Sequence, residues 1–147
     1  MKSIAESIDQ ILFESKPKLM AISPELAGQK PSAQEWSKQE ILGHLIDSAY
    51  NNHQWVVRTS MNRGLDFSPY HQQEWVALQD YNKRDWFTLI DLWIQVNLHL
   101  CNAMQHVSQE ALEYQCNLGK EQPVLLEFII TDYPRHMLMH LEDILGE

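Results

Sequence analysis

The sequence predicts an all-α protein, a four-helix bundle built from one domain that spans residues 1–147. Apolar residues recur at steps of three and four along four long segments, and this spacing places them on one face of a helix. Glycine and proline are scarce, with 5 and 6 copies, which disfavours a β-rich chain with many tight turns. At this length a chain can bury a core without a disulfide or a structural metal, so the helices are expected to pack as a bundle.

The first predicted helix runs from about Ser3 to Met20. Its apolar stripe consists of Ile4, Ile8, Ile11, Leu12 and Leu19. The run Ile22-Ser23-Pro24 is expected to end it, because the residue before a proline disfavours helical geometry. Residues 24–36, which include Gly28 and Pro31, are predicted to be a connector.

The second predicted helix has a clear start signal. Ser37-Lys38-Gln39-Glu40 is a capping box, in which the Ser37 hydroxyl accepts from the Glu40 amide while the Glu40 side chain reaches back. Apolar residues then recur as far as Val57, and the helix is expected to end near Met61. Asn62-Arg63-Gly64 follows as the stop signal.

A long connection, residues 65–80, separates the second and third helices. Its run from Glu74 to Leu78 is predicted to form a short helix. Connections of this length usually have a function such as lining a pocket. Trp36 and Trp75 lie in or beside connections and are therefore candidates for the mouth of a substrate site.

The third predicted helix starts near Asn82. Its stripe consists of Trp86, Leu89, Ile90, Trp93, Asn97, Leu100, Met104 and Val107. Trp86 and Trp93 are expected in the core, because large aromatic side chains dominate core packing. Asn97 is the polar member of the stripe and is predicted to need a buried hydrogen-bond partner.

The last predicted helix begins near Pro123, after an irregular stretch at 108–121, and ends before Gly146. Its stripe consists of Leu125, Leu126, Ile129, Ile130, Tyr133, Met137, Leu141 and Ile144. Pro134 lies inside this pattern. Because proline removes a backbone hydrogen bond, Pro134 is expected to kink the helix or split it.

Charge and composition exclude several function classes. The net charge is −9, from 11 basic and 20 acidic residues, and such a field repels the phosphates of nucleic acids. No apolar run is long enough for a membrane span, and charged residues interrupt the N-terminal segment where a signal peptide would need an apolar core. Cys101 and Cys116 are predicted to be small buried residues, so a cytoplasmic location is expected.

Two of the seven histidines stand out. His136 and His140 are four residues apart, which places both imidazoles on one face of a helix, at a spacing that suits a shared metal ion. Both fall within the apolar arc, where two unpartnered imidazoles would be costly to bury. His71, His99 and His106 are expected to be solvated.

A pair of histidines does not complete a metal site, so a third ligand is needed. The candidates are His44, His53, Asp47, Asp132 and Asp143. On the helical wheel, His53 lies within the main apolar arc of the second helix, whereas His44 lies beside a second face made by Ile41, Ser48 and Trp55. Periodicity alone slightly favours His53.

Two sequence motifs resemble those of DinB/YfiT-like metalloenzymes. Trp36-Ser37 and His44-Leu45-Ile46-Asp47-Ser48 are similar to the second helix of that family, and Asp132-Tyr133-x-x-His136-x-x-x-His140 is similar to its last helix. The resemblance implies an up-down-down-up bundle, often dimeric, with His44, His136 and His140 as metal ligands. His53 then becomes a neighbour of the site. Pro134, between Tyr133 and His136, departs from the family's pattern.

Three imidazoles leave a coordination position open, as in catalytic sites, and they suit zinc or nickel. The resemblance implies a thiol S-transferase or a metal-dependent hydrolase acting on a small molecule, and we expect the transferase because a thiolate binds well to a borderline-soft ion. Asp47, three residues after His44, is a candidate general base for hydrolysis, although a carboxylate there more often orients a ligand. A non-enzymatic, stress-related binding or dimerisation module is the alternative outside enzymes, and a homodimer is expected.

Overall fold

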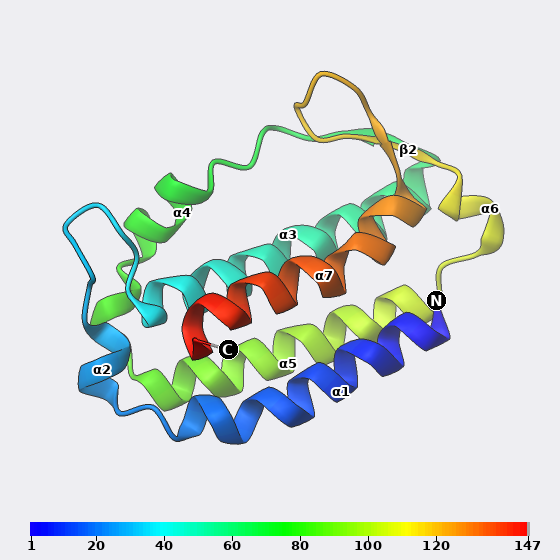
Figure 1. The fold of residues 1–147 in the computed structure, drawn as a ribbon. Helices are drawn as coiled ribbons and strands as arrows, with labels where there is room; N and C mark the ends of the chain where they lie inside the picture. The colour runs from blue at the N-terminus through cyan, green and yellow to red at the C-terminus, as the bar shows by residue number, and fades with distance from the viewer. Residues whose placement is uncertain (147) are drawn as a thin grey trace.

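The computed structural model describes residues 1–146 and contains four long helices. They are α1 (Lys2–Met20), α3 (Lys38–Asn62), α5 (Trp86–Gln105) and α7 (Leu126–Leu145). α3 packs against α5 and α7, and α1 packs against the same two helices. α1 and α7 run in one direction and α3 and α5 in the other (Figure 1). The prediction of an all-α four-helix bundle with up-down-down-up topology is confirmed.

The parallel course of α3 and α5 requires a connection that returns along the length of the bundle. The segment 63–85, called here the crossover segment, makes this return and contains β1 (Leu65–Asp66), α4 (Gln72–Gln79) and the 3₁₀ helix η1 (Tyr81–Lys83). Figure 1 shows it passing from the end of α3 back to the start of α5. The short helix predicted in this connection is confirmed as part of α4.

Three short strands link the crossover segment to the segment before α7. β1 pairs in parallel with β2 (Gln115–Asn117), and β2 pairs in antiparallel fashion with β3 (Val124–Leu125). The stretch 108–121 is therefore not irregular throughout, because it contains both β2 and the short helix α6 (Gln109–Leu112). Strands of two or three residues are too short to show a recognisable alternation of apolar and polar residues in the sequence.

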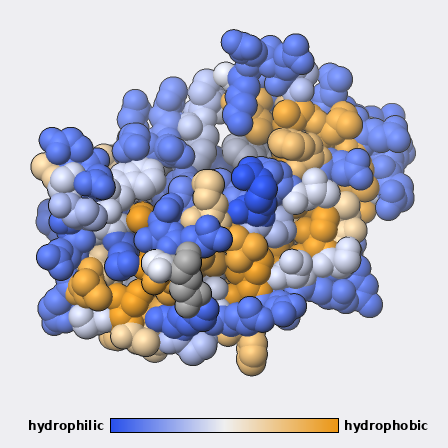
Figure 2. Space-filling model, in the orientation of Figure 1, coloured by the Kyte–Doolittle hydropathy of each residue, from blue (hydrophilic) through white to orange (hydrophobic). Residues whose placement is uncertain are grey.

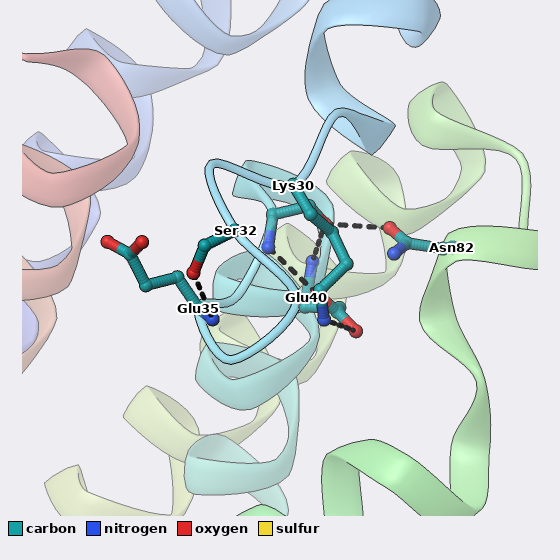
Figure 3. Close-up of polar contacts among 6 residues, drawn as sticks. Lys30, Ser32, Glu35, Glu40 and Asn82 are labelled. Atoms are coloured by element: carbon teal, nitrogen blue, oxygen red, sulfur yellow. Dashed lines mark hydrogen bonds and ion pairs between the residues drawn. The ribbon is translucent and has the colours of Figure 1, made fainter.

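The capping box at the start of α3 is confirmed (Figure 3). Ser37 Oγ accepts from the Glu40 amide at 3.1 Å, and the Ser37 amide donates to Glu40 Oε2 at 2.8 Å. The same hydroxyl donates to Asn82 Oδ1 at 2.7 Å, and Lys30 Nζ lies 3.1 Å from Glu40 Oε2. The cap therefore also joins the start of α3 to η1 and to the preceding connector.

Several predicted boundaries shift. Asn82 lies in η1, and α5 begins later, where the Asp85 side chain caps it by accepting from the Thr88 amide at 2.8 Å. Pro123 precedes strand β3, so α7 begins only at Leu126. The connector 24–36 contains α2 (Pro24–Gly28). α7 ends at Leu145, and Gly146 adopts the left-handed conformation as its C-cap.

Two prolines lie inside long helices. α7 remains one helix through Pro134, so the helix is not split there. Pro17 lies inside α1, within the span predicted for the first helix. Because both histidines of α7 follow Pro134 in the same unbroken helix, they keep their spacing of one turn.

The core lies between the four helices, as the stripes predicted. Trp86 and Trp93 are fully buried, and both cysteines are buried and unpaired. Asn97 has the buried partner it needed, because Tyr133 Oη donates to Asn97 Oδ1 at 2.6 Å. None of the described helices is long and apolar enough to cross a membrane.

Candidate metal centre

Three histidines from two helices converge on one point in the bundle. His44 comes from α3, and His136 and His140 come from successive turns of α7. One ring nitrogen of each lies within 4.8 Å of the others. The ring centroids of His44 and His140, and those of His136 and His140, are 4.7 Å apart, whereas His44 and His136 are separated by 5.4 Å. The packing of α3 on α7 thus brings together residues about ninety positions apart in the sequence.

Burial keeps the imidazoles of His44 and His136 neutral at physiological pH. His44 is only 1% exposed, and burial, followed by the proximity of His140 and His136, lowers its pKa to about 3. Burial and the nearby His140 likewise lower the pKa of His136 to about 4. A neutral imidazole has a free lone pair on one nitrogen, which is the form that ligates metals.

In two of the histidines, Nδ1, called here the outer nitrogen, lies within hydrogen-bond distance of another side chain. Tyr70 Oη lies 3.3 Å from Nδ1 of His44, and Asp143 Oδ2 lies 3.2 Å from Nδ1 of His140. Asp143, a candidate third ligand, therefore contacts a histidine of the cluster through that outer nitrogen. Nε2 of His44 is buried and has no hydrogen-bond partner among the described residues. A buried polar atom without a partner is rare, and it marks the place where a missing partner belongs.

Two aromatic rings lie close to the imidazole of His44. The Trp36 ring lies 5.3 Å from it, and the Tyr70 ring lies nearly parallel to it at an interplanar angle of 3°. Trp75 in turn meets Tyr70 edge-on at 5.2 Å. Trp36 and Trp75, predicted at a substrate mouth, thus lie against the site but do not belong to the lining of the adjoining pocket.

A pocket of about 370 Å³ opens beside His44 and His136. Its lining combines apolar and polar side chains from α3, the crossover segment, the loop before β3 and α7: Ser48, Asn52, Trp55, Pro69, Tyr70, Gln72, Leu118, Lys120, Val124, Phe128, Ile129, Asp132 and Tyr133. Figure 2 shows apolar side chains gathered near β3 and the start of α7, where Leu125 and Phe128 are exposed. Trp55 and Tyr70 were missed as site residues by the sequence analysis, although Trp55 lies on the second face of α3 that the wheel identified beside His44.

Asp47 lies near the histidines in sequence but does not line the pocket. It is 1% exposed, and its Oδ1 accepts from Tyr81 Oη and from Gln79 Nε2, each at 2.6 Å. Burial raises the pKa of its carboxyl group, although these two hydrogen bonds oppose the shift. Asp47 therefore anchors the end of the crossover segment to α3, and a general base would have to come from elsewhere.

The remaining candidate ligands lie apart from the cluster or are otherwise engaged. His53, which periodicity slightly favoured, stacks on His99 of α5 at a centroid distance of 4.6 Å and does not join the three histidines. Asp132 lines the pocket but is held by Arg135 at 2.6 Å. His44, and not the His53 that periodicity slightly favoured, lies beside the two histidines of α7, because α7 packs against the face of α3 that carries His44.

Comparison with known proteins identifies the fold. No protein-family model matches the chain, and no curated protein matches it significantly. The structure of YfiT from Bacillus subtilis, described as a probable metal-dependent hydrolase with an unusual four-helix bundle topology, superposes with a TM-score of 0.81 at 14% identity. The match covers 98% of this chain and 83% of YfiT.

Two structures of a mycothiol-dependent maleylpyruvate isomerase, one of them a histidine-to-alanine mutant, also match. Each superposes with a TM-score of 0.78, at 13% and 12% identity. Both matches cover 97% of this chain but only 59% of the isomerase, so the chain corresponds to part of that enzyme. The superpositions establish the fold, but at identities this low they do not establish the function, which has to be argued from the site itself. The chain therefore has the DinB/YfiT-like four-helix-bundle fold that its histidine motifs predicted.

Proposed function

We propose that this protein is a metal-dependent enzyme in which His44, His136 and His140 hold one divalent ion, with zinc or nickel best suited to three imidazoles. The observation that carries the proposal is the buried Nε2 of His44, which has no partner among the described residues and belongs to a ring clustered with two further imidazoles. A donor set of three imidazole nitrogens fits such an ion. It also leaves at least one coordination position for a substrate.

The pocket beside the histidines supports an enzyme rather than a closed structural site. His44 and His136 form part of its wall, so a small molecule bound there reaches the cluster. A divalent ion, when bound, supplies Lewis-acid chemistry that lowers the pKa of a thiol or a water and polarises a carbonyl group. The chain itself contributes the apolar surfaces of Trp55 and Phe128 and the polar groups of Asn52 and Gln72, which can orient a small substrate.

The transfer of a low-molecular-weight thiol is the reaction that we favour. Hydrolysis benefits from a general base beside the attacking water, but Asp47 does not line the pocket, and its Oδ1 accepts from Tyr81 and Gln79. Asp132 does line the pocket, but the Arg135 guanidinium holds its pKa below the ordinary value and makes it a weak base. A thiol that ionises readily needs no such base. The structural similarity to a mycothiol-dependent maleylpyruvate isomerase supports testing thiols first.

The test of the proposed site is metal content. Protein purified without an affinity tag is analysed for metals, as wild type and as His44→Ala, His140→Ala and His53→Ala variants. Wild type and His53→Ala are expected to hold close to one ion per chain, because His53 pairs with His99 outside the cluster. The other two variants are expected to lose it. Absence of metal from wild type after reconstitution would contradict the proposal and favour a non-enzymatic binding module.

The proposed reaction is tested separately, by measuring the disappearance of small thiols in the presence of electrophilic co-substrates. Wild type should accelerate the loss of the thiol, and His44→Ala should not. Hydrolysis of esters or amides without thiol consumption would instead favour the hydrolase.

We further propose that the protein is a homodimer located in the cytoplasm. We also propose that it does not bind nucleic acids, in line with the net charge of −9. Light scattering tests the dimer, and an electrophoretic shift at low salt tests the absence of nucleic-acid binding.

A further inference from the structure

Tyr70 reaches the histidine cluster from outside the two helices that form it. It belongs to the crossover segment, between β1 and α4. Its Oη lies 3.3 Å from Nδ1 of His44, and the two rings are nearly parallel, at 3°, with centroids 6.3 Å apart. The phenol oxygen and the ring nitrogen are thus within hydrogen-bond distance, and each of them can donate or accept.

The direction of this hydrogen bond decides which nitrogen of His44 carries the proton. If the phenol donates to Nδ1, the proton of the neutral imidazole lies on Nε2, where no described residue accepts it. A buried donor or acceptor without a partner costs about 1–3 kcal/mol, so Nε2 is unsatisfied in either tautomer until a ligand binds it, and a metal ion can bind it only where it carries a lone pair. If the phenol oxygen accepts from Nδ1–H instead, the imidazole is satisfied there and Nε2 has its lone pair free. Burial and the neighbouring Asp47 raise the pKa of Tyr70 above its ordinary value. The phenol therefore stays protonated and places no negative charge beside His44.

The structure holds Tyr70 in this place through α3 itself. Trp75 of α4 packs edge-on against the Tyr70 ring at 5.2 Å. At the end of α4, Gln79 and then Tyr81 donate to Asp47, which follows His44 by three residues on α3. The helix that carries His44 therefore also anchors the segment that carries Tyr70, which fixes the two side chains relative to each other.

We propose that Tyr70 is a positioning residue for His44: its oxygen accepts the Nδ1 proton, and this bond orients the ring and leaves the Nε2 lone pair for the ion. The inference rests on the metal site proposed above. Asp143 lies in the same relation to Nδ1 of His140, so two of the three ligands have their outer nitrogens occupied. Such partners of metal-binding histidines set the tautomer and raise the metal affinity.

The first test needs neither metal nor activity. Nitrogen-15 NMR of the histidine rings, recorded on the metal-free protein near neutral pH, reports which nitrogen of His44 is protonated. Wild type is expected to carry the proton on Nδ1, and Tyr70→Phe, which keeps the ring but removes the oxygen, is expected to show a mixture of tautomers. A wild-type ring protonated on Nε2 would overturn the proposal.

The second test is zinc affinity, measured by competition with a chromogenic chelator. Loss of such a hydrogen-bond partner typically weakens binding about 10–100-fold, and we expect this range for Tyr70→Phe. Tyr114→Phe is the matched control, because its hydroxyl bonds to Glu110 at 2.8 Å away from the site, and its affinity should equal that of wild type. Equal affinity in Tyr70→Phe would overturn the proposal. If wild type bound no zinc at all, the metal site would fail, while the NMR result would still decide the role of Tyr70.

Discussion

His44 combines three properties that suit the metal ligand proposed for it. It is buried, it is neutral because burial lowers its pKa to about 3, and one of its nitrogens already has a partner in Tyr70. An ordinary surface histidine has a pKa near 6.5. At mildly acid pH, protons therefore compete with a metal ion for its ring nitrogen. His44 and His136 remain neutral in that range, so proton competition at these two ligands is weak.

The same pKa shifts predict how stability depends on pH. We expect the free energy of unfolding of the metal-free protein to fall as the pH drops below about 6.5, the ordinary histidine pKa. The unfolded chain then takes up protons on His44 and His136, whereas the native protein resists protonation until its lowered pKa values of about 3 and about 4 are reached. Each histidine contributes up to about 1.4 kcal/mol per pH unit in this window.

Urea denaturation in the presence of a chelator, at several pH values between neutrality and the acid range, measures this slope. Replacing His44 with Gln should reduce the slope, because one of the two proton-binding sites is removed. Asp47 acts with the opposite sign: its pKa is raised in the native state, so its contribution is lost as the pH rises through that pKa. If the slope were the same in wild type and in the His44→Gln variant, this would contradict the lowered pKa that burial gives His44.

At the scale of elements, the site depends on close packing between α3 and η1. Gly43 precedes His44 on α3, and the ring of Tyr81 occupies the space where a side chain at Gly43 would begin. Gln39, one turn earlier, donates to the backbone oxygens of Tyr81 at 2.7 Å and of Arg84 at 2.6 Å. These contacts, together with Asp47, hold the end of the crossover segment against α3.

This packing predicts an unusual sign for a glycine substitution. An alanine within a helix normally stabilises it by about 0.5–1 kcal/mol relative to glycine. Gly43→Ala should instead destabilise the protein by about 1–3 kcal/mol, because its Cβ would overlap with the Tyr81 ring and force a shift. Chemical denaturation measures the effect. Gly28→Ala is the control, since the nearest atom to its Cβ would be 4.0 Å away, and it should change stability little. A Gly43→Ala variant as stable as wild type would contradict the packing.

At the scale of the whole molecule, the proposed ion connects two helices of a bundle that is already packed. His44 lies on α3 and the other two histidines lie on α7, and these helices also share apolar contacts in the core. The core is formed by side chains from all four long helices. Folding is therefore expected to be independent of the ion, which adds stability in proportion to its binding.

Removal of the metal tests this view of the bundle. The chelated protein should keep its helical circular dichroism but unfold at a lower temperature, since an ion present at a hundred times its Kd adds about 2.7 kcal/mol to the free energy of unfolding. The His44→Ala variant should have the same melting temperature with and without chelator. Loss of helicity on chelation of wild type would show instead that the ion is required for folding.

The sequence predicted the helices well because their signals are local. The stripes of α1 and α3 and the capping box of Ser37 and Glu40 depend on residues within a few positions of each other. The starts of α5 and α7 were placed too early, because η1 and β3 lie where the helices were expected to begin. These two short elements are held by pairing with other segments of the chain, η1 through Asp47 of α3 and β3 through β2, and their own sequences carry little sign of it.

The sequence by itself also identified two of the three histidines of the candidate site. The spacing of His136 and His140 is a property of one helix, so it could be recognised without any tertiary information. The choice of His44 over His53 came from the resemblance to a family, and the tertiary structure shows its physical reason, which is that α7 packs against the His44 face of α3. The contact between Tyr70 and His44, and the pocket beside them, were decided by the tertiary structure alone, because the path of the crossover segment depends on packing that no local pattern encodes.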